Sequence, residues 1–301
     1  EYNKIIELSK VDEEPEDEYE SYTKEDFLKE VFMDEKIYEK LVSILQIKKN
    51  LILKGAPGVG KTFAAKRLAF SIMGEKNTER VQFVQFHQSY SYEDFVMGYR
   101  PNDSGGFVLR PGVFYKFCKK AEMDPGHDYY FIIDEINRGN LSKIFGELFM
   151  LIEADKREEE LHLAYREELF SVPKNIYIIG MLNTADRSLA MIDYALRRRF
   201  SFVEMEPAID TLIKVREISP DSKLGKLLAE VKNLNDDIKG DPSLGSGFRI
   251  GHSYFCNSDA VSDVHLSNIV EYEIIPMLEE YWFDNPAKAE DWSNRLREAI
   301  K

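Results

Sequence analysis

The sequence predicts an α/β domain followed by a smaller helical domain. Residues 131–138 (Phe-Ile-Ile-Asp-Glu-Ile-Asn-Arg) begin with an apolar run and continue into two adjacent carboxylates, as expected of a strand buried inside a parallel sheet. Residues 55–62 (Gly-Ala-Pro-Gly-Val-Gly-Lys-Thr) join a short apolar strand to a helical run. Strand and helix signals alternate up to residue 205, and only helical signals follow.

Composition narrows the class of protein. The 301 residues can bury a large core, and the formal net charge of -14 argues against tight nonspecific binding of nucleic acid by the outer surface. Cys118 and Cys256 lie far apart, so we expect buried, inert thiols rather than a disulfide or a zinc site. No apolar stretch is long enough to cross a bilayer and no signal peptide is visible, so we expect a cytoplasmic protein without membrane contact. Because position 1 is Glu, we expect a fragment of a longer protein.

The beginning of the chain is expected to hold a linker and two helices. Residues 11–20 are too charged to pack, so we expect residues 1–22 to form a solvated acidic linker, with an acidic partner-binding arm as the alternative. Thr23 and Asp26 have the spacing of a capping box, which predicts that a helix starts there. A second helical segment leads to the short strand at 51–54.

Residues 55–62 have the pattern of a P-loop and are expected to bind phosphate. Their glycines let backbone N–H groups curl around phosphates, and the N-terminus of the following helix adds partial positive charge. Lys61 would reach the β- and γ-phosphates, and Thr62 would ligate Mg²⁺ together with Asp134. The other predicted phosphate-binding residues of this loop are Gly55, Pro57, Gly58, Val59 and Gly60.

Polar side chains at two strand ends are the candidate catalytic groups. Asp134 and Glu135 end one buried strand, and Asn183 follows another at 175–182. Because open α/β sheets bind ligands at the carboxyl ends of their strands, we expect these groups beside the phosphates. Glu135 would polarise the attacking water, and Asn183 would orient that water or sense the γ-phosphate. Asn137 is a candidate lever through which a partner subunit adjusts Glu135.

Four further segments lie between the P-loop and residue 175. Residues 81–86 alternate like a strand. Residues 97–112 are rich in Gly and Pro and form a loop or hairpin, either to grip a polymer or as a solvated connector. Residues 141–153 are expected to form one apolar helix, and residues 156–173 a β-hairpin.

An arginine cluster, Arg197–Arg199, precedes the last predicted strand at 200–205. Adjacent arginines usually form only a solvated face. Charge on a transferring phosphoryl group, however, is stabilised by cations, which a neighbouring subunit can supply. In a ring-forming protein we expect Arg198 and Arg199 to reach into the site of a neighbouring subunit.

The end of the chain is predicted to be helical. Apolar residues fall at helical spacing from 224 to 238, and residues 269–283 are helical with a break at Pro276. A glycine-containing turn at 245–253 separates these two regions. Arg249, within that turn, is either a phosphate sensor or a salt-bridge partner that packs the helical domain.

Five segments of the chain resemble the McrB family. They are residues 85–95, 134–138, 183–188, 194–200 and 247–255. McrB-type proteins are AAA+ GTPases, the motor subunits of McrBC restriction systems, which cut DNA carrying modified cytosine. The likeness extends from about Thr23 to the C-terminus, and these long motifs are more specific than a P-loop alone.

The resemblance implies a fold and its domains. We expect an AAA+ P-loop NTPase with a parallel central sheet in the order 5-1-4-3-2, a β-hairpin insertion and a C-terminal α-helical lid. The implied division is an acidic linker (1–22), an AAA+ α/β domain (23–206) and a lid domain (207–301).

The resemblance also implies cofactors and partners. The nucleotide would be GTP, with ATP as the alternative, and Mg²⁺ would accompany it. The chain would form a ring, typically a hexamer, that drives DNA translocation for a McrC-type endonuclease subunit. DNA would be recognised mainly through an N-terminal reader domain that this sequence lacks, and cleavage would lie in the partner chain.

The choice of base is not tied to any motif. Residues 183–186 (Asn-Thr-Ala-Asp) superficially resemble the guanine-reading motif of small GTPases. A segment at the end of this strand should lie beside the γ-phosphate, so we expect that Asp186 does not read guanine. Residues around 22–30 are better candidates, because the base of an AAA+ protein should lie near them and under the lid.

Two other functions are compatible with the sequence. The first is an ATP-dependent remodelling chaperone of the MoxR kind, and the second is a non-enzymatic scaffold whose nucleotide only locks an oligomer. Glu135 and Asn183 disfavour the scaffold, and the motifs at 87–95 and 247–255 disfavour the chaperone.

Overall fold

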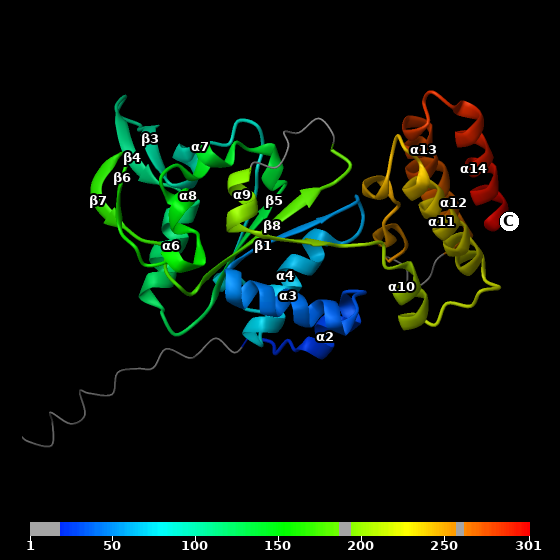
Figure 1. Cartoon of the computed structure of the whole chain (residues 1–301), viewed down its shortest axis with the longest axis horizontal. Coiled ribbons are helices and arrows are strands. Elements are labelled where there is room, and N and C mark those ends of the chain that lie inside the picture. Colours follow the sequence, from blue (N-terminus) through cyan, green and yellow to red (C-terminus); the bar gives the residue numbers. More distant parts are fainter. Residues whose placement is uncertain (1–18, 187–193, 257–261) are drawn as a thin grey trace, which may run out of the picture.

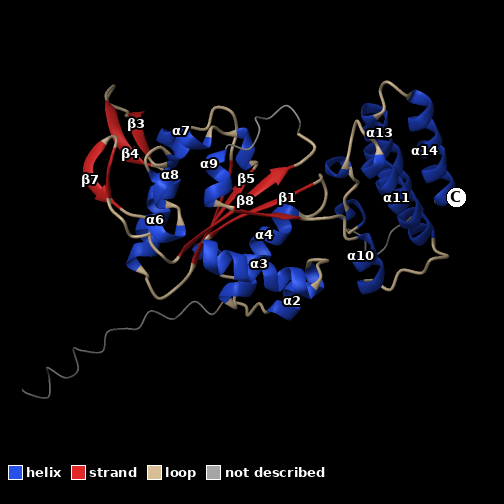
Figure 2. Ribbon diagram, viewed as in Figure 1, coloured by secondary structure: helices blue, strands red, loops and turns tan. Residues whose placement is uncertain are grey.

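The computed structural model describes residues 19–186, 194–256 and 262–301. Most of the predicted linker, up to residue 18, lies outside these ranges, as do the last two residues of the motif at 183–188. Figure 1 shows an α/β unit at the centre and left and a helical unit at the right. Two small hairpins lie at the end of the α/β unit that faces away from the helical unit (Figure 2).

The α/β unit is built on a five-stranded sheet in which every pair of neighbours is parallel. Its strands are β1 (Asn50–Gly55), β2 (Val81–Gln85), β5 (Tyr129–Asp134), β8 (Ile176–Asn183) and β9 (Ser201–Glu204). Their spatial order is β2-β5-β8-β1-β9. Counted within this sheet, that is the predicted order 5-1-4-3-2, so the expected fold class is confirmed.

Both faces of the sheet are covered by helices, which explains the apolar run in β5. Phe131 and Ile133 pack into the core on one face, and Tyr130 and Ile132 pack into the core on the other. One face is covered by α6 (Val113–Met123), α7 (Leu141–Phe145), α8 (Leu148–Leu151) and α9 (Tyr194–Arg199), with the short α5 (Tyr92–Phe95). The other is covered by α2 (Lys24–Glu30), α3 (Glu35–Lys48) and α4 (Lys61–Met73).

The capping box predicted at the start of the first helix is present. The Asp26 carboxylate accepts from the Thr23 backbone N–H at 2.9 Å, and Thr23 Oγ1 accepts from the Asp26 N–H at 3.3 Å. The chain is fixed to the domain slightly before this cap, within the stretch we assigned to the linker. Tyr22 is buried, and its N–H donates to the carbonyl of Gly74 at 2.9 Å.

The expected single helix at 141–153 is wrong. Gly146 has φ 52°, which a continuous right-handed helix does not allow, so α7 and α8 are separate. A Cβ at this position would also lie 2.9 Å from the ring of Tyr92. The apolar pattern runs through both short helices and therefore does not reveal the break. Short 3₁₀ turns η1 (Thr78–Arg80), η2 (Ile136–Arg138) and η3 (Ala154–Lys156) complete this unit.

Two β-hairpins project from the α/β unit. They are β3 (Met97–Pro101) with β4 (Phe107–Pro111), and β6 (Leu161–Leu163) with β7 (Arg166–Phe170). The second confirms the hairpin predicted at 156–173, and the first settles the open choice at 97–112 in favour of a hairpin. Tyr165, between β6 and β7, packs its ring against Tyr99 of β3 and donates to Glu93 at 2.8 Å, so the two hairpins are connected.

Glu147 connects these hairpins to the helices that follow the acidic strand end. Its Oε1 accepts from the hydroxyl of Tyr92 at 2.6 Å and from the N–H of Ala164 at 2.8 Å. Tyr92 in turn packs against Tyr165, with ring centroids 5.8 Å apart. One carboxylate between α7 and α8 therefore contacts both the segment leading into β3 and the tip of the β6–β7 hairpin.

The helical unit contains α10 (Ile209–Val215), α11 (Lys223–Gly240), α12 (Asp263–Asn268), α13 (Ile275–Tyr281) and α14 (Pro286–Ala299). It also contains the turns η4 (Ser246–Phe248) and η5 (His252–Phe255) and a π-helical segment, η6 (Ile269–Ile274). The break expected at Pro276 is displaced. The distortion precedes it as η6, and Pro276 sits in the first turn of α13, which continues directly from η6.

The cysteines meet the expectation only in part. Cys118 is buried in α6, and burial raises the pKa of its thiol. Cys256 is half-buried, and its Sγ donates to the carbonyl of His252 at 3.2 Å. Among the described residues, no helix is both long and apolar enough to cross a membrane.

Candidate nucleotide-binding site

The predicted P-loop lies at the carboxyl end of β1, near the middle of the sheet, and leads into α4. Gly58 and Gly60 have φ values of 73° and 75°, which favour glycine and turn the backbone around the loop. No side chain caps the start of α4, so the N–H groups of its first turn remain available to an anion. The loop therefore has the conformation that a phosphate site requires.

Lys61 lies inside this loop. Its Nζ donates to the carbonyls of Gly55 and Ala56, each at 2.9 Å. Burial lowers its pKa, and the carboxylates of Glu135 and Asp134 act in the opposite direction. The ammonium group is thus already near the acidic strand end and positioned within the loop.

The acidic and amide strand ends meet at the same edge as the P-loop. In the ladder between β1 and β8, Gly55 pairs with Asn183. On the other side of β8 runs β5, which ends at Asp134. Asp134 accepts from the N–H of Glu135 at 3.0 Å, and Asn183 Oδ1 accepts from the N–H of Ala185 at 3.3 Å. The structure therefore brings these predicted residues together.

Glu135 is held in an unusual backbone conformation. Its φ of 49° is in the left-handed region, where non-glycine residues are uncommon and are often found at functional sites. Its Oε2 lies 3.2 Å from Nε of Arg138, and Arg138 Nη2 lies 3.1 Å from Asp186 Oδ2. Asp186 is thus engaged beside the predicted catalytic carboxylate. That it does not read guanine remains a prediction.

The predicted magnesium ligands fit a site that is completed by phosphate. Among the described residues, no group of three or more His, Cys, Asp or Glu side chains could hold a metal ion. Mg²⁺ usually keeps several waters and binds through one or two carboxylates plus substrate phosphates. Thr62, in the first turn of α4, and Asp134, at the end of β5, are a donor set of that kind at one edge of the sheet.

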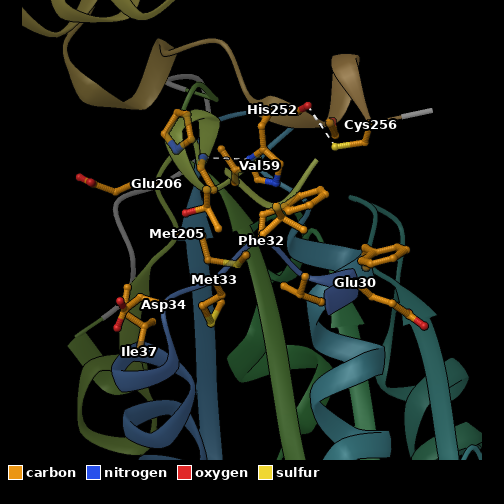
Figure 3. A pocket seen from close by; sticks show the side chains of 18 of the residues that line it. Glu30, Phe32, Met33, Asp34, Ile37, Val59, Met205, Glu206, His252 and Cys256 are labelled. Carbon is orange, nitrogen blue, oxygen red and sulfur yellow. Dashed lines mark hydrogen bonds between the residues drawn. The ribbon is translucent and has the colours of Figure 1, made fainter. Parts of the chain in front are cut away.

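A pocket of about 910 Å³ opens beside Gly60. Its walls come from residues 29–34 at the end of α2 and just after it, residues 203–208 at the end of β9 and just after it, and His252, Ser253 and Cys256 of the helical unit (Figure 3). Of the residues around 22–30 that we expected near the base, only Lys29 and Glu30 line it. Most of that wall is formed by the apolar residues that follow, because the chain turns toward α3 there. The size and position suit a nucleoside attached to phosphates on the loop.

The helical unit lies directly on the P-loop, so it is placed as a lid. The N–H of Ser253 donates to the carbonyl of Gly58 at 2.9 Å. Gly251 also packs against the loop. A Cβ there would lie 2.6 Å from the Pro57 carbonyl oxygen and would collide with the backbone of Gly58.

Replacing Gly251 with Ala should therefore push the lid off the P-loop and weaken nucleotide binding by about tenfold or more, which corresponds to roughly 1.4 kcal/mol. Titration with a fluorescent nucleotide measures this affinity. The matched control is Gly240→Ala at the end of α11, because nothing lies within 4 Å of a Cβ placed there. Equal affinity of the two variants would show that the Gly251 contact does not govern binding.

The side chain of Arg249, which follows η4 in the chain, lies against the end of β9. Its Nη2 lies 3.3 Å from Oε1 of Glu206 and 3.7 Å from Oε1 of Glu204, and its Nε donates to the Ser246 carbonyl at 3.0 Å. This is the salt-bridge alternative considered from the sequence. A role as phosphate sensor stays a prediction.

The two candidate arginines of α9 differ in environment. The Arg199 side chain is 16% exposed, lies over the ring of Phe149 and has Nη2 3.0 Å from Glu153. The Arg198 side chain is 77% exposed, with Nε 3.4 Å from the same carboxylate. The carbonyl of Arg199 accepts from Asn50, the first residue of β1, whereas the P-loop follows the last. Both arginines therefore lie at the opposite edge of the sheet from their own P-loop.

Sequence reasoning missed three residues of this region, and the signals for them differ. Arg138 and His252 stand inside motifs that were singled out, at 134–138 and 247–255, but neither was given a role. Glu153 had no signal, because its contacts with Arg198 and Arg199 join residues far apart in the chain.

A phosphate-binding loop at the end of a central strand, acidic strand ends beside it and a helical lid above define a P-loop nucleoside triphosphatase. Residues 50–200 match the family model of the AAA domain (dynein-related subfamily), and residues 226–290 match that of the McrB alpha-helical lid domain. The chain belongs to the AAA domain family of the dynein-related subfamily, and its AAA and lid regions are of the McrB type, as predicted.

Two curated relatives belong to restriction systems. The EcoKMcrB subunit of the type IV methyl-directed restriction enzyme of Escherichia coli (strain K12) is 51% identical over 292 residues, covering 92% of this chain and 63% of that protein. Component YdiS of the type II restriction enzyme BsuMI of Bacillus subtilis (strain 168) is 28% identical over 206 residues, covering 56% and 60%. The chain thus spans less than two thirds of the length of both relatives.

A solved structure of a putative ATPase from Cytophaga hutchinsonii is also similar, with 13% identity and a TM-score of 0.40, over 69% of this chain and 61% of that one.

Proposed function

We propose that this chain is the GTP-hydrolysing, ring-forming motor of a modification-dependent DNA restriction complex and drives DNA translocation for a partner nuclease. The main support for this function is the contact between the lid and the P-loop. The region that matches the McrB lid model belongs to the helical unit that docks on the P-loop through Ser253. The part of the molecule most particular to the McrB type therefore touches the predicted phosphate site. The remodelling ATPase considered from the sequence is not favoured by the similarity to EcoKMcrB.

The residue roles follow from the placement described above. Lys61 and the backbone of 58–62 hold the phosphates, and Glu135 accepts a proton from the attacking water. Asn183 orients that water. Asn137 is the contact through which a partner subunit adjusts Glu135, and its Oδ1 is buried without a partner among the described residues. Thr62 and Asp134 hold Mg²⁺, which neutralises charge on the β- and γ-phosphates when bound.

The proposed partners extend beyond this chain. We assign an arginine of α9 to the site of a neighbouring subunit, in a ring with six copies of the chain. We assign DNA cleavage to a McrC-type endonuclease subunit and recognition of modified DNA mainly to an N-terminal reader domain. The complex acts in the cytoplasm. We propose the domain division 1–22, 23–206 and 207–301, in which the end of the first segment, at Tyr22, already packs on the α/β domain.

The test is steady-state hydrolysis of GTP and of ATP by the purified chain, with the oligomeric state followed by light scattering. We expect kcat/KM for GTP to exceed that for ATP by at least about tenfold and to rise as the ring forms. The Glu135→Gln variant provides the blank. A preference for ATP would contradict the restriction-motor assignment and favour a remodelling ATPase of the same fold.

A further inference from the structure

His252 presents one ring nitrogen to the pocket beside the P-loop. Its Nδ1 accepts from the backbone N–H of Ala208 at 3.0 Å, so the neutral ring carries its proton on Nε2. Burial lowers the pKa of this histidine to about 4, and the neutral form therefore prevails near neutral pH. The fixed tautomer makes Nε2–H a hydrogen-bond donor.

This donor faces the pocket without a protein acceptor. His252 is 7% exposed and lines the pocket, and Figure 3 shows its ring beside Phe32, which it meets edge to face with ring centroids 5.8 Å apart. Its Nε2 lies 3.8 Å from the position of a Cβ on Gly60. No acceptor for Nε2 is present among the residues that the structure describes. This donor opens into the pocket, so the arrangement is suited to a ligand that supplies an acceptor there.

We propose that Nε2–H of His252 recognises O6 of guanine and is a specificity-determining contact of the pocket. This inference rests on the proposed function, in which the nucleotide is GTP. Guanine presents an acceptor at O6, whereas adenine presents the N6 amino donor at the equivalent position. Adenine would place donor against donor and leave both unsatisfied.

Two carboxylates also line this pocket, and both already accept from protein donors. Glu30 pairs with Arg67 and accepts from the Tyr22 hydroxyl at 3.2 Å, and Asp34 accepts from the Lys36 N–H at 2.9 Å. His252 also neighbours Ser253, which holds the lid on the P-loop. Recognition of the base and closure of the lid therefore involve adjacent residues.

Two substitutions separate the donor from the anchoring role of the ring. In His252→Asn the side-chain oxygen can still accept from the Ala208 N–H, but no donor reaches the Nε2 position. In His252→Gln the terminal amide can donate near the Nε2 position, while the acceptor at Nδ1 is lost. The pair thus removes one function of the ring at a time.

The experiment is competition of GTP, ATP and 2-aminopurine riboside triphosphate, which lacks O6 and the N1 hydrogen of guanine, against a fluorescent nucleotide. We expect His252→Asn to weaken GTP binding about tenfold or more and to change ATP binding less than twofold. His252→Gln should retain a GTP preference. In the wild type, the analogue should bind more weakly than GTP by at least a similar factor. The part of this loss that comes from O6 should be absent in His252→Asn, so the two losses should not add.

Three results would overturn the assignment. Equal losses for GTP and ATP would place the contact on the ribose or a phosphate, and an unchanged GTP preference in His252→Asn would exclude a role in base choice. If the loss from the analogue and the loss from His252→Asn add, His252 does not contact O6. If one variant folds poorly, the comparison of GTP with the analogue on the wild-type protein still tests whether this part of the base contributes to binding. Failure of the proposed function is distinguishable, because the wild-type protein would then prefer ATP.

Discussion

Replacing Glu135 with Gln should lower the rate of GTP hydrolysis by about 100-fold or more and leave nucleotide binding within a factor of a few. Glutamine has nearly the shape of glutamate but cannot accept a proton from the attacking water. The carboxylate follows Asp134 at the edge that also carries Asn183 and the P-loop. Single-turnover hydrolysis and a separate binding titration measure the two effects.

The matched control for this variant is Glu168→Gln. Glu168 lies on β7, far from the P-loop edge, and accepts from the hydroxyl of Tyr115 at 2.8 Å. The hydrolysis rate of this variant should therefore stay near that of the wild type. A Glu135→Gln enzyme that hydrolyses GTP within threefold of this control would exclude Glu135 as the general base. A parallel loss of binding would instead indicate that the substitution disturbs the loop through Arg138.

Replacing Arg198 with Ala should lower kcat of the assembled ring by roughly 10³ to 10⁵, the range measured for arginines that stabilise phosphoryl transfer. The reason for this large effect is where Arg198 lies relative to the P-loop. Arg198 is exposed on α9, at the sheet edge opposite its own P-loop, so it can serve only the site of a neighbouring subunit. Mixing Arg198→Ala subunits with Lys61→Ala subunits should restore activity, because mixed interfaces combine an intact loop with an intact arginine.

Arg199 gives the contrast within the same helix. Its guanidinium donates to the Phe149 carbonyl at 2.6 Å and pairs with Glu153, so Arg199→Ala should lower the stability of the subunit more than its catalytic rate. Thermal unfolding of both variants separates these effects. If Arg198→Ala retains full activity, or if mixing restores nothing, the catalytic arginine is not Arg198.

Much of the fold and of the phosphate site could be predicted because their signals are local in sequence. The apolar run of β5 ends where its carboxylates begin, and the spacing within residues 55–62 contains the loop, its lysine and its threonine. The strand order was inferred from the family resemblance rather than from periodicity, and the structure confirms it.

What could not be predicted depends on contacts between distant segments. Arg249 pairs with Glu206, 43 residues away, and His252 is anchored by Ala208, 44 residues away, so neither environment has a local signature. The break between α7 and α8 depends on the left-handed conformation of Gly146, whereas the apolar pattern continues through both helices. The pocket wall near the base is formed mostly by residues just after the expected segment, 22–30. A turn in the chain decides which residues face inward there, and this turn was not predicted.

The position of Glu147 has a mechanical consequence. It lies between α7 and α8, in the segment that follows Glu135, and its carboxylate holds both Tyr92 and Ala164. The hairpins project from the end of the molecule away from the lid, so their tips are far from the P-loop (Figure 1). Because one carboxylate contacts both hairpin-bearing segments, a rotation of the segment around Glu147 would move the two hairpins together rather than separately.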